Sequence, residues 1–437
     1  MNLSCYVSHH CPQCGGEVTF DQQATGTRCR YCGAGLMIMG ARSAWLSFLI
    51  KPKISVQETA HHVTRIAMKN GWKPPLLRSV MPFYCPFYRT TGHAIRWLQG
   101  HRTVLEGDPG VVEKLQTRDL DLMRPAHEDL SPGLFSPGYR VQSLHLYLAT
   151  RENAGKIPFA PIQREREKHS RKMEADFFDG MQDPGFKITR EKRFRLWEQS
   201  SILFFPLSLV EIREGRQIRL MLIDAVGGSL IRQIRHEEME TLLDNLDLKE
   251  SRSPGETRLK LAPLICPECG GDLDDDPGAH LRFCRSCARG WEAAGGRLRE
   301  RECMWAGNNR PARDAATTFL PFWKRQGEDR HLYVPAFSVR SPRLLYNLTA
   351  RYYHADFPAE PIPYESRLGL RTLPVALPPE GADEMADVVA GTGPRGLFNR
   401  KGTSQSLVLV PFHRRGPDLV EPFKGLAVPI STLGVEI

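Results

Sequence analysis

Eight of the eleven cysteines form four Cys-x-x-Cys pairs, and these pairs fall into two sets with fourteen residues between the pairs of each set. A Cys-x-x-Cys pair on a tight turn can direct two thiolates at one point. Two such turns facing each other complete a tetrahedral site with four sulfur ligands. The predicted metal ligands are Cys11, Cys14, Cys29 and Cys32 in the first set, and Cys266, Cys269, Cys284 and Cys287 in the second.

The residues around the cysteines also repeat. Both sets begin with Cys-Pro-x-Cys-Gly-Gly, at residues 11–16 and 266–271. Proline stiffens the turn, and the glycine after the second cysteine permits a positive φ, so the backbone can fold around a metal ion. The last pair departs from this pattern, because Ala288 follows Cys287 where Gly33 follows Cys32. The ligand count is the same in both sets.

This pattern resembles the zinc-ribbon (rubredoxin-like) module, here in a tandem arrangement of an uncharacterised bacterial type. The resemblance implies Zn²⁺ at two structural sites. Four cysteines leave no coordination position open for water, whereas a catalytic zinc normally keeps one open. Two alternatives to zinc remain. One is disulfide bonds between these cysteines, although disulfides belong to oxidising compartments. The other is an iron centre, because four thiolates also bind iron.

Composition favours a soluble intracellular protein. The chain has 437 residues, of which 41% are hydrophobic and 25% charged, which is ordinary for a globular protein of two to four domains. The first residues lack the basic and apolar segments of a signal peptide, and the longest apolar runs are too short to span a bilayer. We therefore expect a cytoplasmic location and no transmembrane segment. The net charge of +9 favours anionic partners only mildly, because the basic residues are spread along the chain.

Four further segments recur in the same order in both halves, which predicts an internal duplication with a ribbon heading each half. The matches are 86–89 with 321–324, 137–143 with 335–341, 144–148 with 344–348, and 201–206 with 406–411.

The predicted fold class is mainly β with some α (α+β). Hairpins are expected at 83–89 with 93–98, and at 203–213 with 217–223. Helices are expected at 55–70, where Ser55 and Glu58 form a capping box, at 164–179 and at 236–246. Residues 374–396, rich in Pro, Gly and Ala, predict a long mobile loop.

The predicted domain boundaries follow these patterns. They are ribbon 1 at 1–42, β-rich domain A at 43–250, a linker at 251–263, ribbon 2 at 264–303, and β-rich domain B, a repeat of A, at 304–437. With ribbon 2 as an independent unit, Cys266→Ser is expected to unfold that ribbon and to leave the first half intact.

Other candidate sites have simpler interpretations. Residues 391–396 match Gly-x-Gly-x-x-Gly, but they lack the flanking strand and helix of a dinucleotide site. His61 and His62 point different ways on their predicted helix, and a lone cysteine such as Cys85 is usually a core residue. Residues 163–195 mix ten basic with seven acidic residues, which is typical of a solvated face.

The sequence therefore predicts a non-catalytic adaptor or scaffold that binds other proteins of a complex through its duplicated domains. The first alternative is a nucleic-acid-binding protein that uses basic faces of the β domains. A peripheral contact with anionic membranes is a further alternative. The third class, an enzyme, predicts a deep pocket with converging polar groups between the bodies. No catalytic residue can be nominated from the sequence.

Overall fold

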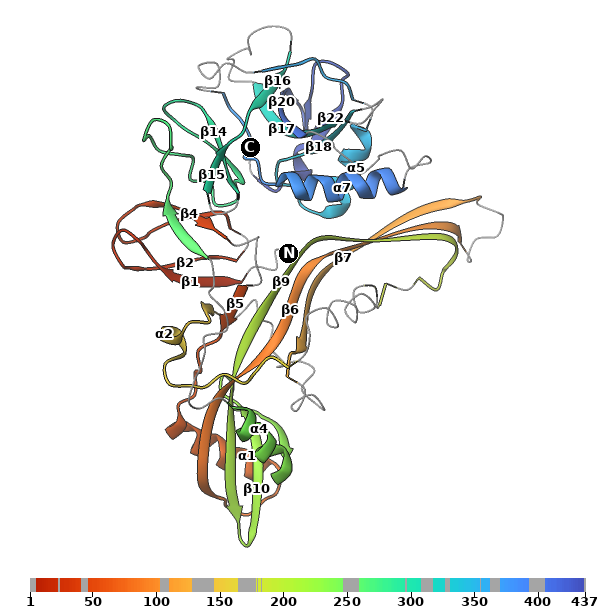
Figure 1. Cartoon of the computed structure of the whole chain (residues 1–437). Helices are drawn as coiled ribbons and strands as arrows, with labels where there is room; N and C mark the ends of the chain where they lie inside the picture. The colour runs from red at the N-terminus through yellow and green to blue at the C-terminus, as the bar shows by residue number, and fades with distance from the viewer. Residues whose placement is uncertain are drawn as a thin grey trace.

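The structure is a computed structural model of the chain, and it is mainly β, as the sequence predicts (Figure 1). It describes residues 5–22, 24–40, 46–102, 110–127, 145–163, 178, 180–181, 183–246, 259–294, 297–307, 317–326, 331–353, 355–361, 370–392 and 405–435. Within these residues, no helix has both the length and the apolar character needed to cross a bilayer. The predicted helix at 164–179 and the match at 137–143 lie outside the described residues, apart from Phe178.

The first half consists of ribbon 1 and a long β body, called body A. Ribbon 1 contains β1 (Tyr6–His10), β2 (Glu17–Asp21), β3 (Gly26–Arg28) and β4 (Gly35–Met39). The strands of body A are β5 (Leu46–Leu49), β6 (Leu76–Arg102), β7 (Val112–Pro125), β8 (His145–Leu148), β9 (Phe186–Glu214), β10 (Gln217–Asp224) and β11 (Leu230–Ile234).

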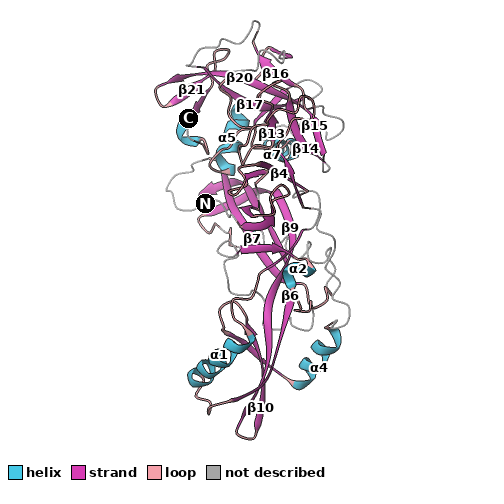
Figure 2. Cartoon of the chain, turned by 90° about the vertical axis from the view of Figure 1, so that its left-hand side faces the viewer, coloured by secondary structure: helices cyan, strands magenta, loops and turns pink. Residues whose placement is uncertain are grey.

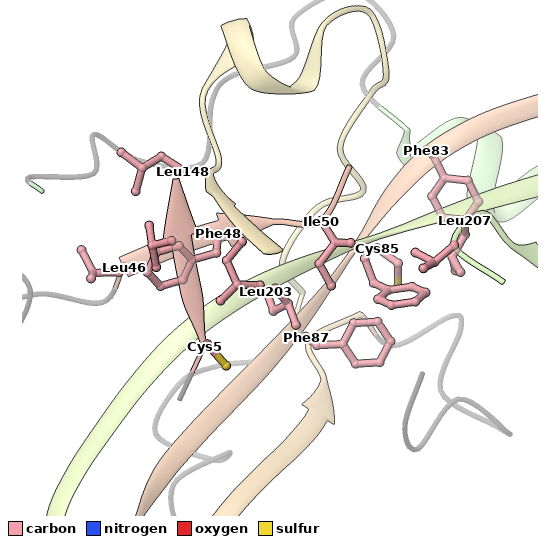
Figure 3. Close-up of a cluster of buried hydrophobic side chains, with 14 of the residues drawn as sticks. Cys5, Leu46, Phe48, Ile50, Phe83, Cys85, Phe87, Leu148, Leu203 and Leu207 are labelled. Carbon is pink, nitrogen blue, oxygen red and sulfur yellow. The ribbon is translucent and has the colours of Figure 1, made fainter. Parts of the chain in front are cut away.

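Strand β9 organises body A. It pairs antiparallel with β6 over almost its whole length, and its other edge pairs with β5 in parallel and with β10 through the predicted hairpin at Glu214–Gln217. Its apolar stretch from Ser201 to Val210 is buried on both faces, because a central strand is covered on both sides. Figure 3 shows part of this core, where Cys5 and Cys85 lie among leucine and phenylalanine side chains. Cys85 is therefore a core residue, as predicted.

The predicted hairpin at 83–98 is wrong. Residues 90–92 are not a turn but the middle of the continuous strand β6, which bulges against β9 between Thr91 and His93. Gly92 is still required, because a Cβ there would lie 3.0 Å from the carbonyl oxygen of Leu196. Pairing with β7 and β9 on both edges outweighs the local turn propensity.

The second half consists of ribbon 2 and a smaller β body, called body B. Strand β12 (Lys260–Pro263) leads into ribbon 2, which contains β13 (Leu281–Phe283), β14 (Gly290–Ala294) and β15 (Arg297–Glu300). The strands of body B are β16 (Cys303–Ala306), β17 (Thr317–Gln326), β18 (His331–Pro335), β19 (Ala359–Pro361), β20 (Gln405–Arg415), β21 (Asp418–Val420) and β22 (Ala427–Pro429), and a 3-10 turn, η2, spans Ile430–Thr432.

Body B pairs its strands in the same order as body A. Its central strand β20 pairs antiparallel with β17 on one edge, and with β16 in parallel and β21 antiparallel on the other. Strand β18 extends the sheet beyond β17 as β7 does beyond β6, and β19 lies beside β16 as β8 lies beside β5.

The helices confirm some predictions and correct others. Helix α1 (Val56–Lys69) has the predicted capping box, and α4 (His236–Asn245) begins where expected. Short α2 (Arg151–Ala154) follows β8. The segment predicted as a mobile loop at 374–396 instead contains α7 (Pro379–Thr392), whose alanines, valines and Met385 pack in the core of body B.

One of the matched segments differs between the halves. Residues 344–348 lie in helix α5 (Pro342–Arg351), which begins with Ser341 as its N-cap, whereas residues 145–148 form strand β8. The two leucine- and tyrosine-rich segments therefore do not share one local structure.

The two ribbons are packed together rather than separated. The predicted linker at 251–263 ends in β12, which pairs with β4 of ribbon 1 in a three-stranded sheet. Met37 of β4 packs with Leu264, Cys266 and Trp291 of ribbon 2. Thr25 also donates its backbone N–H to the carbonyl of Pro277 at 3.0 Å. The ribbons thus form one unit.

Body A and body B meet along the far half of β6, β7 and β9, which passes beside α7 (Figures 1 and 2). Ile95 and Leu196 of these strands belong to the same apolar cluster as Val388 of α7 and Trp323 of β17. The backbone N–H of Trp197 donates to the Glu384 carboxylate of α7 at 2.6 Å. The far half of body A is therefore docked on body B.

Candidate functional site

All four Cys-x-x-Cys pairs lie on turns of one kind. In each turn, the N–H of the residue after the second cysteine donates to the carbonyl of the first, at 2.9–3.0 Å. That residue has positive φ in all four turns, at 73° in Gly15, 75° in Gly33, 73° in Gly270 and 58° in Ala288. Ala288 thus adopts the glycine conformation without being a glycine.

The second glycine of each Cys-Gly-Gly has another role. A Cβ on Gly16 would lie 2.4 Å from the ring of Tyr31, and a Cβ on Gly271 would lie 2.5 Å from the Ser286 hydroxyl. In both ribbons the obstructing residue belongs to the opposite turn. The glycine therefore lets the two turns of a ribbon approach each other closely.

Each set of four sulfurs converges on one point. Within a set, all Sγ atoms lie within 4.8 Å of one another. The closest pairs across the turns are Cys11–Cys32 at 3.8 Å, Cys14–Cys29 at 3.7 Å, Cys266–Cys287 at 3.7 Å and Cys269–Cys284 at 3.4 Å. Ligands about 2.3 Å from a tetrahedral metal lie roughly 3.8 Å apart, whereas disulfide sulfurs lie about 2.05 Å apart. The spacing fits a metal site and not a pair of disulfides.

The electrostatics of the sulfurs also fit a cation. The backbone N–H of Cys32, followed by that of Tyr31, lowers the pKa of Cys29 to about 6 although burial opposes this. Burial and the neighbouring cysteines raise the pKa of Cys287 to about 12. Cys29 belongs to the first set and Cys287 to the second. A bound cation would favour the thiolate form of all four cysteines in each set.

The donor chemistry limits what these sites do. Four thiolates are compatible with zinc and also suit iron. His10, next to Cys11, has its Nδ1 3.2 Å from the Gly15 carbonyl oxygen and is not needed as a ligand. In the described part of the chain, no other group of His, Cys, Asp and Glu side chains has this convergence. Four cysteine ligands leave no coordination position open for water in a tetrahedral site.

A cleft of about 840 Å³ lies where the ribbons, the far half of body A and body B meet. We call it the junction cleft. The ribbons contribute β4 with Gly40, His280 just before β13, Arg282 of β13, and Trp291 to Ala293 of β14. The cleft's other walls include the His93, Asp119 and Trp197 region of body A and the amino-terminal ends of α5 and α7. Strands β4 and β14 directly follow Cys-x-x-Cys turns, so these turns position one wall of the cleft.

On the wall of the cleft that body A forms, the side chains of His93, Asp119 and Trp197 lie close together. His93 Nδ1 lies 2.6 Å from the Asp119 carboxylate, and the His93 ring stands edge-on to Trp197 with centroids 5.0 Å apart. Trp197 has φ of 52°, which is rare for a bulky residue, and its ring N–H donates to the Gly381 carbonyl at 3.2 Å. Contacts with α7 therefore hold Trp197 in a strained conformation at the cleft.

The ribbon 2 wall carries a second polar group, and it is nearly buried. His280 Nε2 lies 3.0 Å from the Glu292 carboxylate, whose other oxygen accepts from Arg301 at 2.6 Å. Arg282, which is 2% exposed, donates to the Asp274 carbonyl and to the Thr25 hydroxyl of ribbon 1. The bond to Thr25 links ribbon 2 to ribbon 1 at the cleft.

No sequence pattern predicts the lining of the junction cleft, because its residues are scattered between Gln22 and Glu384. Residues proposed as alternatives lie elsewhere. His62 is on α1 with Arg65 as its neighbour at 3.0 Å, and Gly391 lies in α7 rather than in a dinucleotide-binding loop. The rest of that motif, 393–396, lies outside the described residues.

Comparisons with protein-family models, curated proteins and solved structures give no match to this chain. Its function is therefore inferred from its own residues.

Proposed function

We propose that the chain is a non-catalytic, zinc-binding adaptor that docks other proteins of a complex. Zn²⁺ bound by Cys11, Cys14, Cys29 and Cys32, and by Cys266, Cys269, Cys284 and Cys287, would stabilise the ribbons. The observation that carries the proposal is the position of the ribbons. They form one unit beside both bodies and build a wall of the junction cleft, while all four sulfurs of each set face one another.

We also propose that the chain arose by internal duplication, which gives an adaptor two related bodies. The strand register supports this. Phe87 pairs with Leu203 in body A, and Phe322 pairs with Val408 in body B. Arg89 pairs with Ser201, and Lys324 with Ser406. Residues that match between the two halves therefore pair with each other at the same register in both sheets. Chance similarity between the segments would not produce this agreement.

The polar groups of the junction cleft favour binding over catalysis. His93 and His280 are each hydrogen-bonded to a carboxylate and not to a hydroxyl or thiol. The Ser341 hydroxyl accepts the N–H of Leu344 as the N-cap of α5. Nucleophilic catalysis needs a hydroxyl or thiol beside a base, and the described lining does not present that pair.

Nucleic-acid binding is the second candidate, because the first part of β9 is rich in basic residues. Exposed side chains there are Lys187, Arg190, Lys192, Arg193 and Arg195. Several already have partners, since Arg193 pairs with Glu191 and Lys192 donates to the Gly391 carbonyl. Phosphates or an anionic membrane surface would compete with these contacts, so this surface ranks below the adaptor proposal.

Affinity purification of the tagged full chain from its native cells, with and without nuclease, tests the adaptor proposal. A defined set of proteins that survives nuclease and 0.5 M salt is expected. The matched control is Lys187→Glu/Arg190→Glu, which reverses charge on β9 and should retain the same set. Loss of the set on nuclease treatment or in this control would favour nucleic acid instead. Loss of the set in 0.5 M salt would favour nucleic acid as well, because phosphate contacts depend strongly on salt. Recovery of no partner would overturn the adaptor proposal.

A further inference from the structure

The junction cleft has an excess of negative charge at one end. Glu198 of β9 and Glu380 and Glu384 of α7 line it around Trp197. Among the described residues, Glu380 and Glu384 have no cation within ion-pair distance, and Glu198 has only Arg195 at 3.4 Å. The other cleft carboxylates have side-chain partners, His93 for Asp119 and His280 with Arg301 for Glu292.

The carboxylates at this end of the cleft repel one another. Partial burial, together with the nearby carboxylates of Glu198, Asp387 and Glu380, raises the pKa of Glu384 although the Trp197 N–H opposes this. Like charges that share a site repel one another, and a cation placed between them removes that cost. Trp197 and His93 place aromatic rings at the same end, where a guanidinium or ammonium group gains further attraction.

Other walls of the cleft are apolar. Met37 and Met39 of β4, Trp291 of β14 and Phe337 of body B line the cleft and provide surface against which the rest of a peptide would pack.

We infer that the junction cleft binds a short segment of a partner protein that carries an arginine or lysine side chain. The cation would lie among Glu198, Glu380 and Glu384 beside Trp197, and the rest of the segment would pack on the apolar walls. This inference rests on the proposed adaptor function, and it names the chemistry of the partner. The volume of about 840 Å³ suits such a segment, since pockets that enclose small ligands span about 300–1,000 Å³.

The probes for this inference are capped tripeptides, acetyl-Ala-X-Ala-amide, with X as arginine, lysine, citrulline or glutamate. Citrulline has the shape of arginine without its charge. Ligand-observed NMR with the full zinc-loaded chain measures their affinities. The arginine and lysine peptides should bind at least about tenfold more tightly than the citrulline peptide, since charge-assisted hydrogen bonds are roughly twice as strong as neutral ones.

The variant Glu380→Gln/Glu384→Gln should weaken the arginine peptide about tenfold or more and leave the citrulline peptide unchanged. The glutamine at 384 retains an acceptor for the Trp197 N–H, and unchanged zinc content and thermal unfolding would show an intact fold. Glu240→Gln, an exposed carboxylate on α4, is the matched control and should change nothing. Equal binding of arginine and citrulline peptides, or no effect of the double variant, would overturn the inference.

Affinity purification with the double variant separates the two proposals. Proteins retained by the natural chain and lost from the double variant support both. Proteins retained equally by both chains leave the adaptor proposal standing and overturn the assignment of the cleft. Arginine-selective peptide binding without any captured protein supports the cleft and overturns the adaptor.

Discussion

At the scale of single residues, the metal-binding turns depend on one backbone conformation. Gly15, Gly33 and Gly270 adopt it at little cost, and a Cβ at any of them would meet nothing within 4 Å. Ala288 adopts it with φ of 58° and pays the steric penalty of a side chain in the left-handed region. Ribbon 2 therefore carries a local strain that ribbon 1 does not.

Ala288→Gly is expected to stabilise the metal-loaded chain by about 0.5–1 kcal/mol, because glycine relieves the left-handed penalty. Chelator competition and thermal unfolding of the metal-loaded chain measure the effect. Gly15→Ala is the reciprocal control and should destabilise by a similar amount through φ alone, since its Cβ has space. A destabilising Ala288→Gly would show that the Ala288 methyl group, which is buried, contributes more through packing.

At the scale of elements, strand β12 decides how the ribbons relate to each other. It runs from its pairing with β4 of ribbon 1 directly into Cys266, and Leu264 beside it packs on Met37. A ribbon with so little core of its own is held by its metal and by its neighbour. The sequence-based expectation that ribbon 2 unfolds alone does not allow for this shared packing.

Cys266→Ser is therefore expected to reduce the metal content from two ions per chain to one and also to loosen ribbon 1. Hydrogen exchange of the β4 amides should become faster by about tenfold or more, because β12 loses its anchor. Cys303→Ser, a buried cysteine outside both sets, is the control and should keep two ions. Unchanged hydrogen exchange of the β4 amides would show that the two halves of the chain unfold independently.

At the scale of the whole molecule, the two bodies and the ribbons enclose the junction cleft together. The far half of β6, β7 and β9 reaches body B, while the ribbons close another side (Figure 1). A metal ion bound by either set of cysteines would act on the cleft through the turns from which the cleft wall continues. Ligand binding would in turn stabilise the assembled state.

Elemental analysis should find two zinc ions per chain. Removal of both by a strong chelator is expected to weaken the arginine peptide by more than about tenfold and to lower the thermal unfolding temperature, since metal binding and folding are coupled. Restored zinc should recover both properties. Full peptide binding by the metal-free chain would show that the bodies form the cleft without the ribbons.

The sequence alone determined the features that depend on neighbouring residues. Cysteine spacing specifies the ligand sets, Ser55 with Glu58 specifies the start of α1, and Gly215 specifies the β9–β10 turn through its φ of 59°. The alternation and density of apolar residues indicated a mainly β fold. Each of these signals acts over a few residues, so pattern and local conformation agree.

Only the tertiary structure decided the rest. Residues 90–92 look like a turn, but β7 and β9 pair along both edges and extend the strand through them. Gly381 and Gly391 lower the helix propensity of residues 379–392, yet the core of body B provides the burial that stabilises the helix. The junction cleft joins Trp197, Trp291 and Glu384 from three distant segments. Such contacts depend on how strands pair and layers pack across the whole chain, and no local pattern contains that information.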